Sequence, residues 1–140
     1  MPKINFFNED TNYTLKGKTS IKKWINETIS AEGYKLSELN FIFCSDDYLL
    51  RINQDFLQHD YYTDVITFDN SEELKTILGD IFISIDRVKD NAKQNNAKTI
   101  DELCRIIIHG TLHLLGYKDK SKNDKIAMTA KEDFYLAKRS

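Results

Sequence analysis

The amino-acid sequence predicts an α+β fold with an α/β-like order of elements and a small, mixed, four-stranded sheet flanked by helices. Four short runs rich in β-branched and aromatic residues alternate with segments whose apolar residues recur at helical spacing. The last two runs are joined only by NSEELKTIL, which is too short for a helical crossover and favours an antiparallel pair. The predicted order is therefore βαβαββ followed by helices, or βαβαββααα.

Each element has its own signal in the sequence. The strands are expected at 3–8, 39–45, 63–69 and 79–85. The helices are expected over 19–33, from Ser45 through Phe56, over 99–116 and over 124–138. Ser45 is of the type that caps a helix N-terminus. Thr99 and Glu102 have the spacing of a capping box, which predicts that the long third helix begins there.

Length and composition are those of a globular domain. The chain has 140 residues, the usual size of one domain, and we expect a single domain over 1–140. Hydrophobic residues make up 41% and charged residues 30%, which is close to the globular average and argues against wholesale disorder. The formal net charge of −2 gives no bulk electrostatic argument for nucleic-acid binding and leaves only a local basic patch open.

The cysteines and the N-terminus indicate a compartment. Cys44 and Cys104 each lie inside a hydrophobic run, which predicts two buried free thiols in a reducing environment. The N-terminal MPKINFFNED lacks the apolar core of a signal peptide, and no apolar run approaches the roughly 18 residues of a membrane span. We therefore expect a cytoplasmic protein without a membrane partner.

The segment HGTLHLLGYKD, residues 109–119, predicts a metal site. His109 and His113 are four residues apart on a predicted helix, so their imidazoles project from one face. Gly116 lets the chain leave the helix, and Asp119 follows where a returning turn can bring a third ligand, as in the metzincin spacing. Two histidines and a carboxylate form a catalytic zinc set with a fourth position for water, whose pKa falls toward about 7. We predict one zinc ion per chain.

Two other interpretations of this segment stay open. Two histidines at this spacing also occur by chance in packed helices, where each is a satisfied core residue. A metzincin-like peptidase is the second, but its motif has a glutamate directly after the first histidine, as general base. Here Gly110 takes that position and cannot accept a proton. This glycine favours a metal hydrolase other than a peptidase.

These residues belong to a longer resemblance. HGTLHLLGYKD is similar to the signature H-G-x-L-H-L-x-G-Y-D-H of the YbeY family of rRNA-maturation endoribonucleases. INQDFLQHDYYTDVITF, 52–68, resembles that family's L-N-x-x-[FY]-R-x-K-D-x-x-T-[DN]-V-L-S-F segment, and LGDIFIS, 78–84, resembles its L-G-D-I-x-I segment. The tail places Met128 and Glu132 much as the family does. The matching segments follow one another in the family's order, from about 41 to 136.

The resemblance implies a function and partners. It implies a single-strand-specific, metal-dependent endoribonuclease that acts in 16S rRNA 3′-end maturation and ribosome quality control. The expected partners are single-stranded RNA, an rRNA precursor and the small ribosomal subunit, and no DNA is expected. It also implies a mixed four-stranded sheet with flanking helices and a zinc site at the end of a cleft.

The chain departs from the family pattern at the proposed site. The family's third ligand is usually histidine, preceded by aspartate, whereas this chain has Asp119 preceded by Lys118. A carboxylate oxygen also ligates zinc, so the site is kept with less positive charge. The family's arginine after the aromatic residue aligns with Leu57, which removes a phosphate contact that the resemblance implies. His59, where the family often has lysine, is expected to take part of that role.

Three residues are predicted to be catalytic: Arg105, His59 and Glu132. Arg105 precedes His109 by one turn and shares its face. Glu132 is a candidate for proton transfer, for a hydrogen-bond partner that orients a histidine ligand, or for a surface residue. Asp64 and Glu102 are the other candidates for proton transfer, although each also has a structural explanation as a strand-end or capping residue.

Several basic and aromatic side chains are candidates for binding RNA. Basic residues could line a path for the phosphate backbone or form solvated helix faces: Lys89, Lys93, Lys98, Arg105 and Lys118. Tyr61, Tyr62 and Tyr117 could stack unpaired bases or pack against the fold.

A non-catalytic ribosome biogenesis factor with a structural metal is the remaining hypothesis. The count of three ligands argues against it, since structural zinc sites usually have four protein ligands.

Overall fold

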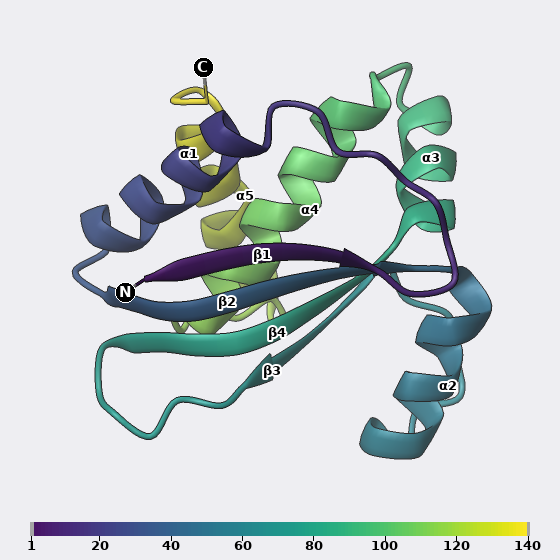
Figure 1. Ribbon diagram of the computed structural model, residues 1–140, viewed down its shortest axis with the longest axis horizontal. Coiled ribbons are helices and arrows are strands. Elements are labelled where there is room, and N and C mark those ends of the chain that lie inside the picture. Colours follow the sequence, from purple (N-terminus) through teal and green to yellow (C-terminus); the bar gives the residue numbers. More distant parts are fainter. Residues whose placement is uncertain (1, 140) are drawn as a thin grey trace.

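A four-stranded mixed sheet organises the computed structural model, which describes residues 2–139 (Figure 1). The strands lie in the order β1-β2-β4-β3, with these bounds: β1 (Lys3–Asn8), β2 (Lys35–Cys44), β3 (Val65–Asp69) and β4 (Thr76–Ser84). β1 and β4 both run parallel to β2, whereas β3 is antiparallel to β4. The predicted mixed sheet and antiparallel last pair are therefore confirmed.

Five helices complete the order βαβαββααα. Their bounds are α1 (Lys18–Ala31), α2 (Asp46–Leu57), α3 (Ile85–Gln94), α4 (Thr99–Leu114) and α5 (Lys122–Leu136). The sequence pattern assigned no residue range to α3, and it placed Ile85 at the end of the fourth strand. In the structure Ile85 begins α3 instead, because the Ser84 hydroxyl accepts a hydrogen bond from the Arg87 amide and caps the helix. Within residues 2–139, no helix is both long and apolar enough to cross a bilayer.

The predicted helix caps have different outcomes. Ser45 caps α2 as expected, because its hydroxyl accepts a hydrogen bond from the Tyr48 amide at 3.1 Å. The predicted capping box at Thr99 and Glu102 is wrong. Lys98 is the N-cap of α4, and its backbone carbonyl, without any side-chain bond, accepts from the first turn. A capping box does form at α5, where Ser121 and Asp124 bond reciprocally.

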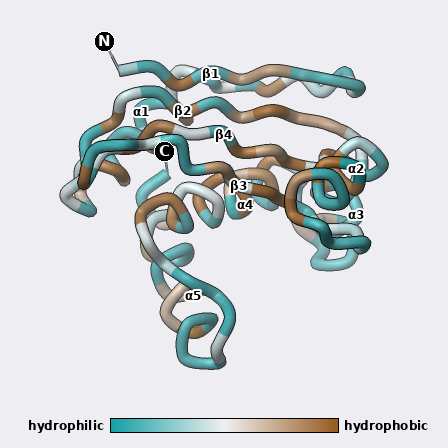
Figure 2. The backbone as a smooth tube through the Cα atoms, turned by 90° about the horizontal axis from the view of Figure 1, so that it is seen from below, coloured by the Kyte–Doolittle hydropathy of each residue, from teal (hydrophilic) through white to brown (hydrophobic). Residues whose placement is uncertain are grey.

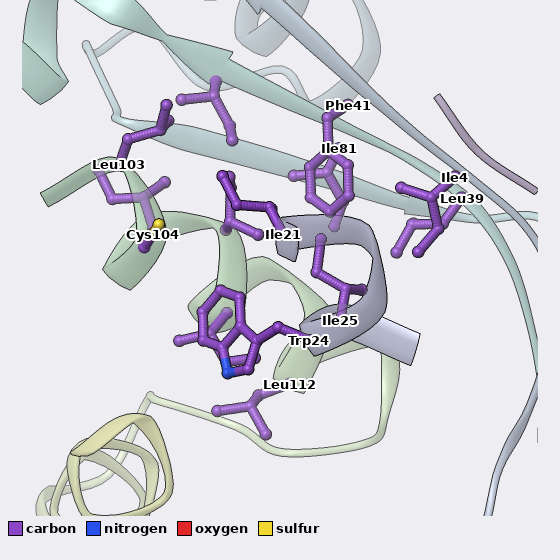
Figure 3. Packing of buried hydrophobic residues seen from close by; sticks show 14 of the residues in the cluster. Ile4, Ile21, Trp24, Ile25, Leu39, Phe41, Ile81, Leu103, Cys104 and Leu112 are labelled. Atoms are coloured by element: carbon purple, nitrogen blue, oxygen red, sulfur yellow. The ribbon is translucent and has the colours of Figure 1, made fainter. Parts of the chain in front are cut away.

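The main core lies between one face of the sheet and the helices α1 and α4. Figure 3 shows Ile21, Trp24 and Ile25 of α1 packed among residues of α4 and the sheet. The indole nitrogen of buried Trp24 donates a 2.7 Å hydrogen bond to the backbone carbonyl of Tyr135, which ties α5 to the same core. In Figure 2, α5 projects away from the strands and carries long hydrophilic stretches. Cys44 and Cys104 are buried free thiols, as predicted.

Candidate metal centre

The side chains of His109, His113 and Asp119 converge on one point. Both histidines lie on one face of α4, and their Nε2 atoms are 3.1 Å apart. One carboxylate oxygen of Asp119, Oδ2, lies 3.3 Å from each Nε2 atom. A tetrahedral zinc site with bonds of about 2.0–2.1 Å has donor atoms separated by about 3.3 Å. The spacing and the chemistry of these three donors therefore fit a metal with one further position open, and the three form a group that could hold an ion.

Each histidine is held in the tautomer that metal binding needs. The Nδ1 atom of His113 donates to the backbone carbonyl of Tyr117 at 3.1 Å. The Nδ1 atom of His109 lies 2.6 Å from Oε2 of Glu132. Because each Nδ1 carries the shared proton, each Nε2 keeps its lone pair for a metal.

The turn after α4 returns Asp119 to the histidines. Gly116 has a φ of 100°, a left-handed conformation that suits glycine at the end of a helix. The amide of Gly116 bonds to the carbonyl of His113, and the amide of Tyr117 bonds to the carbonyl of Leu112. This pair of bonds is a Schellman motif, which ends the helix and turns the chain back.

A network of hydrogen bonds around Glu32, at the end of α1, holds the same turn through Tyr117. The hydroxyl of Tyr117 donates to Oε1 of Glu32 at 2.6 Å. The other oxygen of Glu32 accepts from the Tyr135 hydroxyl and, at 3.2 Å, from Nζ of Lys131. Burial raises the pKa of Glu32, but these donors outweigh burial, so the pKa of this carboxyl lies below its usual value. Tyr117, which we expected to stack bases or pack, thus links α1 to the metal-binding turn.

Glu132 bridges Arg105 and His109, which is one of the three proposed ligands. We call these ligands, His109, His113 and Asp119, the triad. Its side chain is 9% exposed, and it accepts from Nη1 of Arg105 at 2.9 Å as well as facing His109. Burial lowers the pKa of His109, but the hydrogen bond and charge of Glu132, with the charge of Asp119, raise it above its usual value overall. Among the roles open to Glu132, these contacts support orientation of His109.

We expect Glu132→Gln to weaken metal binding by roughly 10- to 100-fold, the usual effect of losing such an outer partner. A glutamine has one acceptor oxygen, so His109 and Arg105 must compete for it, and the imidazole loses its fixed orientation. Equilibrium competition with a zinc chelator measures the affinity. Asp133→Asn is the matched control, because Asp133 pairs with the same Arg105 at 2.8 Å but is 61% exposed. Equal effects of both changes would contradict the role of Glu132.

The triad lies in the wall of a cavity of about 370 Å³. Its remaining lining comes from α2, from β3 and from the segment between them: Asn53, Leu57, His59, Tyr61, Thr63, Asp64, Val65, Ile66 and Thr67. The structure therefore brings His59 to the same cavity as the predicted ligands. Leu57, which aligns with the family arginine, also faces this cavity. Asn53 and Thr67 had no signal in the sequence that singled them out.

Other predicted residues lie elsewhere. Arg105 does not line the metal cavity, and its guanidinium is engaged by Glu132 and Asp133. Its catalytic role stays a prediction, and its contacts favour an action through Glu132. Of the candidates for proton transfer, Glu102 lies with Arg105 beside a separate hollow, whereas Asp64 lines the metal cavity. None of the basic residues of the expected phosphate path is among the described residues that line it.

Gly110 faces the sheet and not the metal centre. A Cβ atom at this position would lie 3.0 Å and 3.2 Å from two side-chain carbons of Ile81, and 3.5 Å from a carbon of Thr67. The glycine thus permits the close approach of α4 to β3 and β4. A Cβ atom here would press against side chains of the sheet, so the position does not fit the glutamate of the peptidase motif without a shift in packing.

We expect Gly110→Glu to destabilise the fold by about 3 kcal/mol or more, because it buries an unpaired charge and overpacks the core. Thermal unfolding followed by circular dichroism should show the melting temperature lowered by roughly 10 °C, or no folded protein. Thr129→Glu, at an exposed position of α5, is the control and should melt close to wild type. A stable Gly110→Glu protein that hydrolyses casein would reverse the interpretation of this position.

Comparison with known proteins gives a consistent result. The family model described as Endoribonuclease YbeY matches residues 3–140. A protein of Cytophaga hutchinsonii named Endoribonuclease YbeY is 57% identical over 136 residues, covering 97% of this chain and 95% of that protein. A protein of the same name from Karelsulcia muelleri is 51% identical over 133 residues, covering 95% and 93%. A solution structure of a Thermotoga maritima protein superposes with a TM-score of 0.65 at 30% identity, covering 95% of this chain and 86% of that one.

Proposed function

The chain belongs to the Endoribonuclease YbeY family, and on this premise we propose that it is a single-strand-specific, zinc-dependent endoribonuclease. The observation that carries the proposal is the position of the triad. Three donors with the separations of a tetrahedral site lie in the wall of a cavity, and the cavity leaves room for a substrate. Three protein ligands are the number that catalytic zinc sites use, since a fourth position must stay open.

The residues of the chain have distinct parts in this proposal. A bound zinc ion would supply Lewis-acid chemistry, which lowers the pKa of water and offsets phosphate charge. His109, His113 and Asp119 hold the ion, and Glu132 keeps His109 oriented with its proton on Nδ1. Arg105 neutralises and positions Glu132 from the other side. His59, which lines the same cavity, contacts the substrate.

Asp64 is the best-placed carboxylate for moving a proton. It lines the cavity together with the triad, and it is not one of the three proposed ligands. In the hydrolysis of a phosphodiester, the attacking water must lose a proton, and a carboxylate within the cavity can accept it. Glu132 is less suited to this step because both of its oxygens are already engaged.

The biological substrate that we propose is a precursor of small-subunit rRNA. The comparisons name an endoribonuclease. From the resemblance described above we propose action at the 3′ end of 16S rRNA, participation in ribosome quality control, contact with the small ribosomal subunit and a cytoplasmic location. Depletion of the protein should then lead to accumulation of 16S precursors with extended 3′ ends, measured by mapping the RNA termini. Precursors with normal 3′ ends would contradict this substrate.

The activity itself is tested by incubating purified, zinc-loaded protein with four substrates in parallel. We expect cleavage of single-stranded RNA, and no cleavage of duplex RNA, single-stranded DNA or casein. Removal of the metal with a chelator should stop cleavage, and added zinc should restore it. His113→Ala protein, purified identically, controls for contaminating nucleases. Casein hydrolysis would favour the peptidase, and tight zinc binding without any hydrolysis would favour a non-catalytic ribosome factor.

A further inference from the structure

We propose that His59 and Tyr61 form a stacking platform that holds one unpaired base of the RNA beside the metal centre. This subsite rests on the proposed function, because it supplies a contact for the same substrate in the same cavity. The platform is formed by the segment between α2 and β3, which lines the same cavity as the histidines of α4.

The two rings already stack on one another, and an unpaired base could extend this stack. The ring centroids of His59 and Tyr61 are 5.2 Å apart, and the ring planes differ by only 19°. The Tyr61 hydroxyl lies 3.1 Å from Nδ1 of His59 and joins the rings by a hydrogen bond. Tyr61 lines the cavity but is 56% exposed, so much of its side chain stays accessible to a base.

The platform is anchored to the fold by one buried residue. The side-chain amide of Asn53 donates to the backbone carbonyl of Tyr61 at 2.9 Å. The backbone carbonyl of Asn53 accepts from the amide of His59 at 3.0 Å. Asn53 is 2% exposed and sits on α2, so both ends of the short segment are tied to a rigid helix. A segment held in this way loses little conformational freedom when a base binds.

The charges around the cavity explain why stacking is needed here. Among residues 2–139, none that lines the cavity is lysine or arginine, and two carboxylates, Asp64 and Asp119, are present. Leu57 stands where the resemblance places an arginine. Apart from the metal, the protein therefore offers the RNA backbone little positive charge at this point. A base can still bind through its π face, because stacking on an aromatic ring needs no positive charge.

The chain supplies a matched control in the next residue. Tyr62 directly follows Tyr61 in the sequence, and its exposed fraction of 55% is nearly the same. Its hydroxyl, however, donates to Asp47 in the first turn of α2 at 3.2 Å, and Tyr62 does not line the cavity. A general effect of losing an exposed tyrosine would appear at both positions, whereas base stacking requires Tyr61.

The experiment combines these variants with single abasic sites in the RNA. Zinc-loaded wild type, Tyr61→Ala, Tyr61→Phe and Tyr62→Ala are compared by steady-state cleavage of a single-stranded oligoribonucleotide. We expect Tyr61→Ala to raise KM by roughly 5- to 150-fold with a smaller change in kcat, since stacking of one base corresponds to that range. Tyr61→Phe, which keeps the ring, should recover most of the loss, and Tyr62→Ala should leave KM near the wild-type value.

The abasic substrates identify the partner of the ring. When a single abasic site is moved along the oligonucleotide, wild type should show a raised KM at one position, and Tyr61→Ala should no longer distinguish that substrate from the intact one. An unchanged penalty at that position in Tyr61→Ala would overturn the platform, as would equal effects of Tyr61→Ala and Tyr62→Ala. If wild type cleaves no RNA, the proposed function fails and the platform fails with it. RNA cleavage with an unaltered KM in Tyr61→Ala overturns the platform alone.

Discussion

Replacing His113 with alanine is expected to remove the metal from the protein, from about one zinc ion per chain to near zero, because two remaining donors are fewer than catalytic zinc sites use. Elemental analysis of protein purified without a histidine tag measures the stoichiometry. The Nε2 atom of His113 lies 3.1 Å from that of His109 and 3.3 Å from Oδ2 of Asp119, so the change removes one of three converging donors. Ribonuclease activity should disappear together with the metal.

The control for this change is the third histidine of the chain. His59 lines the cavity but does not belong to the converging triad, so His59→Ala should keep its zinc. Circular dichroism should show that both variants are folded, since His113 is half-buried and lies in the wall of the cavity. Full zinc occupancy in His113→Ala would refute its assignment as a ligand.

The second large effect is expected at Asp119. Substitutions here test both whether the carboxylate is the third donor and whether the turn brings this residue to the metal. Asp119→Ala should weaken zinc binding strongly, whereas Asp119→His should retain it, because an imidazole is also a good zinc ligand and the turn brings the residue to the same place. Chelator competition measures both affinities. The comparison separates loss of a donor from disturbance of the turn.

Asp64→Asn serves as the control for charge at this site. Asp64 is a carboxylate of the same cavity outside the triad, so its removal should reduce cleavage but not zinc affinity. If Asp119→Ala binds zinc as tightly as wild type, a different residue provides the third donor. If Asp119→His loses the metal, the turn after Gly116 does not place a longer side chain correctly.

Short-range patterns in the sequence predicted most of the fold and the centre of the site. The spacing of His109 and His113 could be interpreted because both donors lie on one helix, where residues four apart share a face. Gly116 and Asp119 extended that pattern by a single turn. The antiparallel pairing of β3 and β4 followed from the short link between them, which is again a local property.

Contacts that depend on distant parts of the chain could not be predicted in this way. Glu132 had three possible roles in the sequence, and only the packing of α5 against α4 supports one of them, by placing its carboxylate 2.6 Å from His109. Glu32 gave no signal, because its partner Tyr117 is 85 residues away. The local rule also misled at Thr99 and Glu102, where the capping-box pattern is present but Lys98, and not Thr99, is the N-cap of α4.

The contacts that hold the proposed metal site come from helices far apart in the sequence, which has a consequence for when a metal can bind tightly. Glu132, which orients His109, belongs to α5 near the end of the chain, while Glu32, which holds Tyr117, belongs to the end of α1 near its beginning. A chain still emerging from the ribosome has His109 and His113 before it has the last helix. We therefore expect the affinity for a metal to rise when α1 and α5 dock on α4, because each brings a carboxylate that holds part of the site. A chain truncated before α5 should bind the metal more weakly than the full chain.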